Sequence, residues 1–170
     1  MKKPKSIRTL FENQQFYLGN EQQEKQIKKA IRIEKAILSF LPKKRRGFFQ
    51  IGSKVVVLNL NNSLDKEVFK IGFIHAFELN QYGFRVEVLL PPYKSLYIST
   101  FEINKVYHSI KDLAQHNRVY LIERVKEYER IFREDNDTLP NQTKQTYKKI
   151  ESQIIHVLRK SNLGESLYCM

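Results

Sequence analysis

The chain has 170 residues, of which 41% are hydrophobic, and a mean hydropathy of −0.51. These values are typical of one globular domain with a single modest core and exclude a disordered chain. Its apolar runs are too short to cross a bilayer, the basic start is followed by polar residues instead of a secretion signal, and the single cysteine, Cys169, cannot form an internal disulfide. We therefore expect a protein of a reducing, cytoplasmic location.

The net charge of +12 is concentrated at one end of the chain. Residues 1–46 contain 13 basic and 4 acidic residues, a difference of +9, and include Lys2, Lys3, Lys5 and Arg8. Residues 47–110 contain 6 and 5, a difference of +1, and residues 111–170 contain 11 and 9, a difference of +2. Because concentrated charge creates a local potential, the first quarter of the chain is expected to attract a polyanion.

Residues 20–41 are predicted to form an amphipathic helix. Apolar residues recur at the spacing of one helix face: Ile27, Ala30, Ile31, Ile37, Leu38 and Leu41. Five cations fall on the opposite side: Lys25, Lys28, Lys29, Arg32 and Lys35. Pro42 is expected to stop this helix, so that the stretch PKKRRG, residues 42–47, forms the exit from it.

Residues 47–108 are predicted to form a small antiparallel β barrel or twisted sheet of about five strands, which makes the whole chain an α+β protein. Short runs rich in β-branched and aromatic residues cover residues 52–60, 68–79, 84–90 and 95–103. Turn-prone residues separate them, notably Asn80–Gly83, which predicts a tight hairpin connection, and Pro91–Pro92, which is expected to end a strand.

The spacing Gly52-x-x-Val55-x-Val57, followed by Lys70-x-Gly72-x-Ile74 and Val86-x-Val88, resembles the SH3-like barrels of Tudor and KOW modules. The resemblance covers about 60 residues and implies only the shape of this segment. No functional residue follows from it.

Residues 109–170 are predicted to form a pair of helices that packs on the barrel. One helix has an apolar stripe of Ala114, Leu121, Val125, Tyr128 and Phe132, with charges of both signs on its exposed side, and the second covers about residues 143–160. The predicted organisation is therefore a basic segment at 1–46, a barrel at 47–108 and a helical pair at 109–170.

The stretch PKKRRGFFQ, residues 42–50, is the strongest candidate for a binding site. Lys43, Lys44, Arg45 and Arg46 are suited to phosphate contacts, and Gly47 would permit close approach of the backbone. If Phe48 and Phe49 point in opposite directions, at most one enters the core, and the other is either a platform for a base or packs on a terminal helix. Two other interpretations remain open: a solvated helix exit and a nuclear-localisation signal.

A second candidate group lies at or beside predicted turns and contains Tyr82, Arg85, Tyr93 and Lys94, with Tyr97 nearby. Tyrosines interleaved with cations suit single-stranded nucleic acid, and they suit a peptide groove equally well. Ordinary packing at the rim of the β module is the third interpretation.

The search for catalytic motifs is negative. The four histidines, His75, His108, His116 and His156, are far apart, and phosphate-binding glycine loops and hydrolase elbows are absent. Glu78 and Glu87 flank the Asn80–Gly83 turn, but we interpret them as surface residues and not as nuclease carboxylates. We expect no enzymatic activity, no metal and no cofactor.

The leading hypothesis is a non-enzymatic protein that binds DNA or RNA through its phosphate backbone. The predicted contact residues are Lys25, Lys28, Lys29, Arg32, Lys35, Lys43, Lys44, Arg45, Arg46, Tyr82, Arg85, Tyr93 and Lys94. The alternatives are an SH3-like adaptor with an acidic protein partner, or a subunit of a larger ribonucleoprotein assembly. A third is attachment of the basic helix to an anionic membrane surface.

Overall fold

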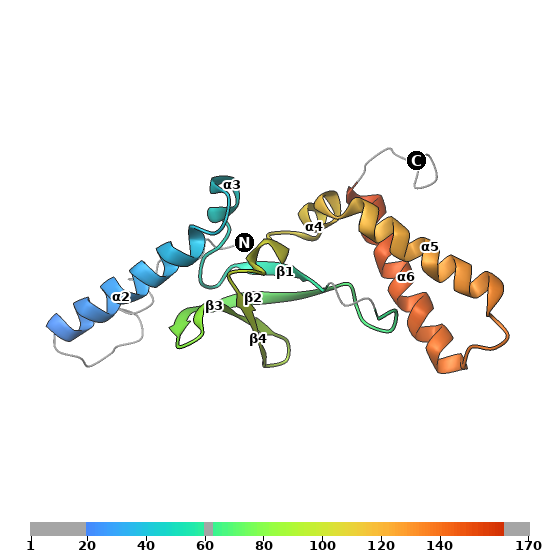
Figure 1. The fold of residues 1–170 in the computed structure, drawn as a ribbon, viewed down its shortest axis with the longest axis horizontal. Coiled ribbons are helices and arrows are strands. Elements are labelled where there is room, and N and C mark those ends of the chain that lie inside the picture. Colours follow the sequence, from blue (N-terminus) through green and yellow to red (C-terminus); the bar gives the residue numbers. More distant parts are fainter. Residues whose placement is uncertain (1–19, 60–62, 162–170) are drawn as a thin grey trace. The chain divides into compact units, whose positions relative to one another are not determined.

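The computed structural model describes residues 20–59 and 63–161 as a mixed α+β fold (Figure 1). Its helices are α2 (Asn20–Leu38), α3 (Lys43–Arg46), α4 (Ile110–His116), α5 (Arg118–Glu134) and α6 (Asn141–Ser161). Its strands are β1 (Lys54–Leu58), β2 (Phe69–Asn80), β3 (Gly83–Leu90), β4 (Lys94–Ser99) and β5 (Val106–Tyr107), with a 3-10 turn, η1 (Ile103–Lys105), before β5. Lys2, Lys3, Lys5, Arg8 and Cys169 lie outside the described residues.

The described chain forms two compact units. The first contains the residues up to Val55 together with Ile71–His108, and so includes α2, α3, β3, β4 and β5. The second contains Val56–Lys70 and the described residues from Ser109 onward, and so includes α4, α5 and α6. The ends of β1 and β2 that face the 59–68 connection belong to the second unit.

The five strands form one open antiparallel sheet with the order β4-β3-β2-β1-β5. The predicted class and the approximate strand number are confirmed. Of the two predicted forms, a barrel and a twisted sheet, the closed barrel does not form in the described residues, because the edge strands β4 and β5 do not pair with each other. Closing a sheet needs a ladder between its edges, and β5 has only two residues with which to form one.

The hairpin between β2 and β3 forms where the sequence predicts it. Asn80 pairs with Gly83, so the loop consists of two residues. The backbone N–H of Tyr82 donates to Asn80 Oδ1 over 2.8 Å, and Gly83 has a φ of +116°, which side-chain-bearing residues rarely adopt.

Close packing of β2 against β3 requires a second glycine. A Cβ atom at Gly72 would lie 2.7 Å from Leu89 O and 2.7 Å from Val88 Cγ1, both well inside contact distance. Val86 and Val88 of β3 are buried, and α2 contacts β3 and buries its Ile27 and Ile37. The core of the first unit therefore lies between this helix and the sheet.

The segment after α2 differs from the prediction. The helix ends at Leu38, and the N–H groups of Phe40 and Leu41 then donate to the carbonyls of Ile37 and Leu38 in tighter turns. Residues 43–46, predicted as a helix exit, instead form the one-turn helix α3, with Pro42 in the N-cap position. Proline suits the start of a helix because its missing N–H would have no helical partner there.

Three helices follow the sheet where two were predicted. The hydroxyl of Ser109 caps α4 by accepting from the N–H of Asp112 over 3.0 Å. Asn117, with φ −125° and ψ 27°, leaves helical geometry and separates α4 from α5, although the apolar stripe continues across this break. Within the second unit, α4 and α5 both pack on α6.

Arg124 of α5 anchors the segment 63–66 within the second unit. Only 6% of its surface is exposed, and its Nη2 donates to Ser63 O over 2.9 Å and to Lys66 O over 3.0 Å. Tyr128, one turn further along α5, donates its hydroxyl to Leu64 O over 2.6 Å, and burial raises the pKa of this phenol. Side chains of α5 thus supply the hydrogen-bond donors that the backbone carbonyls of the irregular segment 63–66 need.

Candidate functional site

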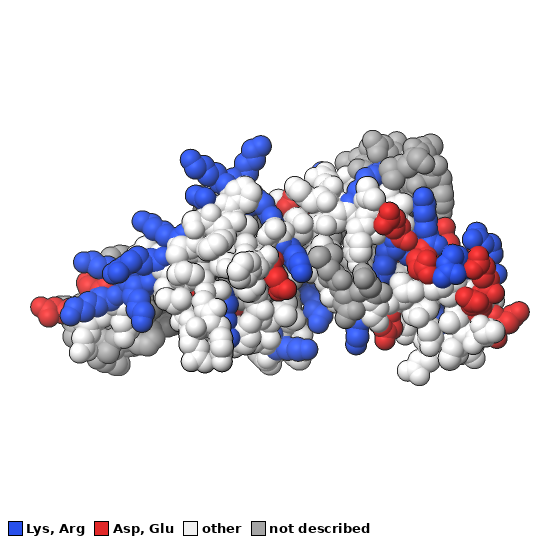
Figure 2. All heavy atoms as spheres, in the orientation of Figure 1, with Lys and Arg blue, Asp and Glu red and all other residues white. Residues whose placement is uncertain are grey.

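Five exposed cations form a continuous basic arc on α2. We use this name for Lys25, Lys28, Lys29, Arg32 and Lys35. At ~100° per residue they fall within about 120° of the helix circumference, and at ~1.5 Å per residue they extend over about 15 Å. Figure 2 shows the corresponding blue side chains along α2, at the left of the view.

Helix α2 also contains three acids, Glu21, Glu24 and Glu34. Among the described residues, no Asp or Glu lies within ion-pair distance of an arc cation. Glu34 is on the opposite side of the helix, near the buried residues, where burial raises the pKa of its carboxyl. Glu21 and Glu24 are exposed near the start of the helix, so the five cations of the arc outnumber the exposed acids of α2.

The four cations of α3 divide into two pairs. Lys43 and Lys44 are exposed, whereas Arg45 and Arg46 are half-buried and donate to backbone carbonyls. Arg45 donates to Asn104 O over 3.2 Å and also to Val106 O, and Arg46 Nε donates to Leu41 O over 2.9 Å. The two arginines therefore fix the position of α3, and the two lysines are its accessible charges.

Arg45 makes one further contact, with an aromatic ring. Its guanidinium carbon lies 4.6 Å from the centroid of the Tyr107 ring. A planar cation over the face of a tyrosine is an attractive arrangement that holds the side chain in place. Together with its two carbonyl acceptors, this contact joins α3 to β5.

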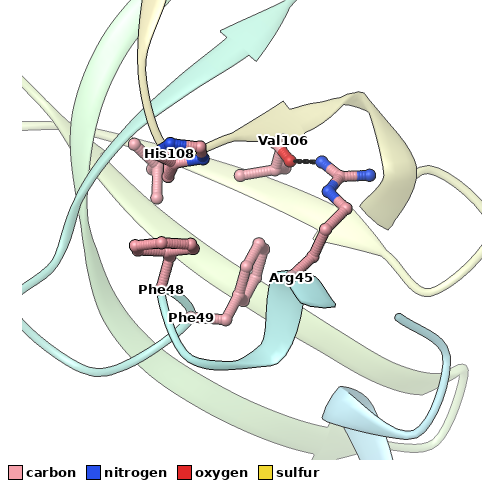
Figure 3. Close-up of a pocket in the computed structure, with 6 residues that line it drawn as sticks. Arg45, Phe48, Phe49, Val106 and His108 are labelled. Atoms are coloured by element: carbon pink, nitrogen blue, oxygen red, sulfur yellow. Dashed lines mark hydrogen bonds between the residues drawn. The ribbon is translucent and has the colours of Figure 1, made fainter. Parts of the chain in front are cut away.

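Phe48 and Phe49 follow α3 and differ in exposure, although they lie in a turn and not in the strand that the alternation argument assumes. Phe49 is buried, with 3% of its surface exposed, and Phe48 is 50% exposed. The ring of Phe48 stacks on His108, with centroids 4.2 Å apart and planes inclined by 15°. Figure 3 shows these rings beside Val106 and Arg45, around a recess of about 210 Å³ that includes space open to solvent.

The second candidate group is divided between the two ends of β3. Tyr82 belongs to the β2–β3 hairpin, and Tyr93 and Lys94 belong to the turn and strand after β3. Eight residues of strand extend about 27 Å, so these side chains do not form one cluster. Tyr82 is 88% exposed and Tyr93 is 90% exposed.

Arg85 points to partners on the two neighbouring strands. Its Nε donates to Glu78 Oε2 of β2 over 2.7 Å, and its guanidinium carbon lies 3.9 Å from the ring centroid of Tyr97 on β4. The cross-strand register pairs Glu78 with Arg85 and Glu87 with Ala76, so the two acids do not face each other. Glu87, predicted to be a surface residue, is instead buried, with 9% of its surface exposed, and its carboxylate lies 2.7 Å from His75 Nδ1.

The described residues contain no group of three or more His, Cys, Asp or Glu side chains that could hold a metal ion. In the same part of the chain, every helix is too short or too polar to cross a membrane. The described residues do offer exposed cations on α2 and α3 and several exposed aromatic side chains.

One member of the recess was missed by the sequence analysis. In the sequence His108 is an isolated histidine, whereas in the structure it stacks on Phe48, 60 positions earlier in the chain. No local pattern indicates this pairing, because it depends on where β5 places the residue that follows it. Comparison of the chain with protein-family models, curated proteins and solved structures found no match.

Proposed function

We propose that the chain is a non-enzymatic nucleic-acid-binding protein that contacts the phosphate backbone through the basic arc, Lys43 and Lys44. The observation that supports this proposal is the arc itself: five exposed cations on one side of α2, with no described acid paired to them. Arg45 and Arg46 support the site by positioning α3.

The dimensions of the arc suit a polyanion. Duplex DNA has one negative charge per ~1.7 Å of its axis, so about 15 Å of helix faces several phosphates at once. Flexible lysines adapt to such a series of charges without reading the bases. The proposal is therefore one of broad affinity with little sequence discrimination, as expected for a free protein or for a subunit of a ribonucleoprotein.

The test compares two variants that lose the same charge from different places. The first replaces the arc, Lys25, Lys28, Lys29, Arg32 and Lys35, with alanine. The control replaces five exposed cations of the second unit with alanine: Lys111, Lys126, Lys149, Arg159 and Lys160. Each set has four lysines and one arginine, and each variant has a formal net charge of +12 − 5 = +7.

We expect the parent protein and the control to bind oligonucleotides with an affinity that falls steeply between ~50 and 200 mM salt. The arc variant should bind far more weakly at the lower salt concentration. The slope of log affinity against log salt should become shallower by up to about 4, since each phosphate contact contributes ~0.7 to 0.9 to it. Equal losses in both variants, or no binding by the parent at low salt, would reject the proposal.

A second candidate function is an SH3-like module that binds a protein. The outer edge of β4 pairs with no described strand, and exposed aromatic residues lie before, within and after it: Tyr93, Tyr97 and Phe101, which are 90%, 46% and 92% exposed. An unpaired edge beside aromatic side chains is suited to an extended peptide that adds a strand. Strands β1 to β4 follow one another as a meander, and β5 crosses over to lie beside β1.

The two functions separate by mutation. Replacement of Tyr93 and Phe101 with serine should abolish co-purification of a peptide partner and leave the salt-dependent affinity for oligonucleotides unchanged. If the same double variant lost its oligonucleotide affinity instead, the β4 edge would belong to the nucleic-acid site and the adaptor function would be discarded.

A further inference from the structure

We infer that Phe48 is a stacking platform for an unpaired base, which makes single-stranded nucleic acid the preferred ligand of this protein. The inference rests on the proposed function and adds a ligand class and a site to it. It is carried by the stacked pair of Phe48 and His108, by the anchors that hold this pair, and by the lysines of α3.

The platform is half open and its inner side is supported. Phe48 keeps 50% of its surface exposed while its ring lies 4.2 Å from that of His108, at 15° between planes (Figure 3). The exposed half of this large apolar ring is in contact with water, so covering it with a ligand is favourable. A nucleic-acid base offers a flat aromatic surface of matching size, and stacking does not depend on which base it is.

Both ends of the stack are fixed by neighbouring contacts. Phe49, the next residue, is buried, with only 3% of its surface exposed, and it holds the segment to the core. Arg45 bonds to the carbonyl of Val106, two residues before His108. Because the rings are already held in place, a ligand that stacks on Phe48 loses less free energy to ordering of the protein.

The surroundings of Phe48 favour a nucleic acid over an apolar peptide. Lys43 and Lys44 are exposed on the helical turn that precedes it, so cations are available for the phosphates on either side of a stacked base. A Cβ atom added at Gly47 would meet no atom within 4 Å, which leaves the backbone between the lysines and the ring open. In a duplex the bases stack on each other, so only unpaired bases can use the platform.

The first experiment uses the absence of tryptophan from the chain. Phe48→Trp keeps an aromatic ring at the platform and introduces the protein's sole tryptophan. We expect its fluorescence to be quenched on addition of an unstructured single-stranded oligonucleotide, and to change little with a duplex of the same length. Phe101→Trp is the matched control, because Phe101 is 92% exposed in the same unit, and it should not be quenched.

The second experiment measures affinity at ~50 mM salt with single-stranded RNA, single-stranded DNA and duplex DNA. Phe48→Leu retains apolar bulk and removes the aromatic face, so it should weaken binding to both single strands by about 5- to 100-fold. Duplex affinity and the salt slope should stay as in the parent, and Phe101→Leu should bind like the parent. A larger loss for RNA than for DNA would identify RNA as the natural ligand.

The outcomes distinguish this inference from the proposed function. If the arc variant loses binding while Phe48→Leu and Phe101→Leu remain equal to the parent, the phosphate-binding function stands and the platform is overturned. Equal quenching of the two tryptophans would overturn it as well. Absence of oligonucleotide binding by the parent would overturn both, and retention of a peptide partner by the parent but not by Phe48→Leu would assign the platform to protein recognition.

Discussion

Helices α2 and α5 have similar lengths, 19 and 17 residues, and similar amphipathic patterns, yet they arrange their charges differently. On α2, the cations of the basic arc have no described acid as a partner. On α5, Arg130 bonds to Glu127 and to Glu134, one at each side of it along the helix. Whether a cation can bind an external anion therefore depends on the acids that contact its side chain, and much less on the number of charges in the surrounding sequence.

The same distinction exists within four residues of α3. Lys43 and Lys44 extend from the surface, and Arg45 and Arg46 bond to carbonyls of the chain. Figure 2 shows the contrast at the level of each unit: blue side chains gather over α2 and α3, whereas red and blue alternate over the C-terminal helices. Variants that remove one cation of each kind can therefore test the comparison.

The largest effect is expected from Arg124→Met. The change removes the hydrogen bonds that the Arg124 guanidinium donates to Ser63 O and Lys66 O. The arginine is buried, with 6% of its surface exposed. Loss of buried hydrogen bonds from a charged donor should lower the free energy of unfolding by about 2 to 4 kcal/mol. Urea unfolding followed by circular dichroism measures it.

Arg130→Met is the matched control on the same helix. Arg130 has a side chain that is 43% exposed, and exposed ion pairs contribute only ~0 to 1 kcal/mol. If the two variants were equally stable, the distinction between an anchoring arginine and a surface arginine on α5 would fail.

An intermediate effect is expected from Arg45→Met. This variant removes the bonds to Asn104 O and Val106 O and should lower the free energy of unfolding by about 1 to 2 kcal/mol. Lys44→Met, at the exposed neighbouring position, should change it by less than about 0.5 kcal/mol. Equal destabilisation by both substitutions would show that α3 does not contain two kinds of cation.

The smallest effect is expected from Glu34→Gln, and it depends on pH. Burial raises the pKa of Glu34 above its ordinary value of 4.5, so the ionised carboxylate disfavours folding at neutral pH. The protonated carboxyl of Glu34 is compatible with burial, so its contribution to the free energy of unfolding is complete below about pH 4.5. This contribution is lost as the pH rises through the raised pKa of the folded protein. The variant should be more stable than the parent at pH 7.

This advantage of Glu34→Gln should decrease as the pH falls to about 4, where the parent carboxyl is itself neutral. Thermal unfolding of the parent and the variant at both pH values measures the difference. A variant that is less stable than the parent at pH 7 would show that the Glu34 carboxylate has a stabilising partner.

Local patterns in the sequence predicted much of the fold. The spacing of apolar residues located α2, and β-branched runs separated by turn residues located four strands. The Asn80–Gly83 turn was predictable because asparagine accepts hydrogen bonds from nearby backbone N–H groups and glycine adopts positive φ, and Asn80 and Gly83 do so here. The start of α3 was not predictable, because proline both ends helices and begins them.

Long-range contacts account for what the sequence analysis missed. The helix break at Asn117 lies within an uninterrupted apolar stripe, so periodicity predicted one helix across it. The fixed positions of Arg45 and Arg46 depend on backbone carbonyls, which every residue has and which leave no mark in a sequence. Pairing of Phe48 with His108 required the topology that brings α3 and β5 together.

The close packing around Gly72 limits which residues evolution can place at this position. Since a side chain there would collide with Leu89 O and Val88 Cγ1, any descendant that replaced the glycine would have to reshape the hairpin as well. The cations of α2 face solvent, and each could become the other basic residue without structural cost. Relatives of this protein should therefore retain Gly72, at a fixed distance from the hairpin loop, even where their surface charges differ.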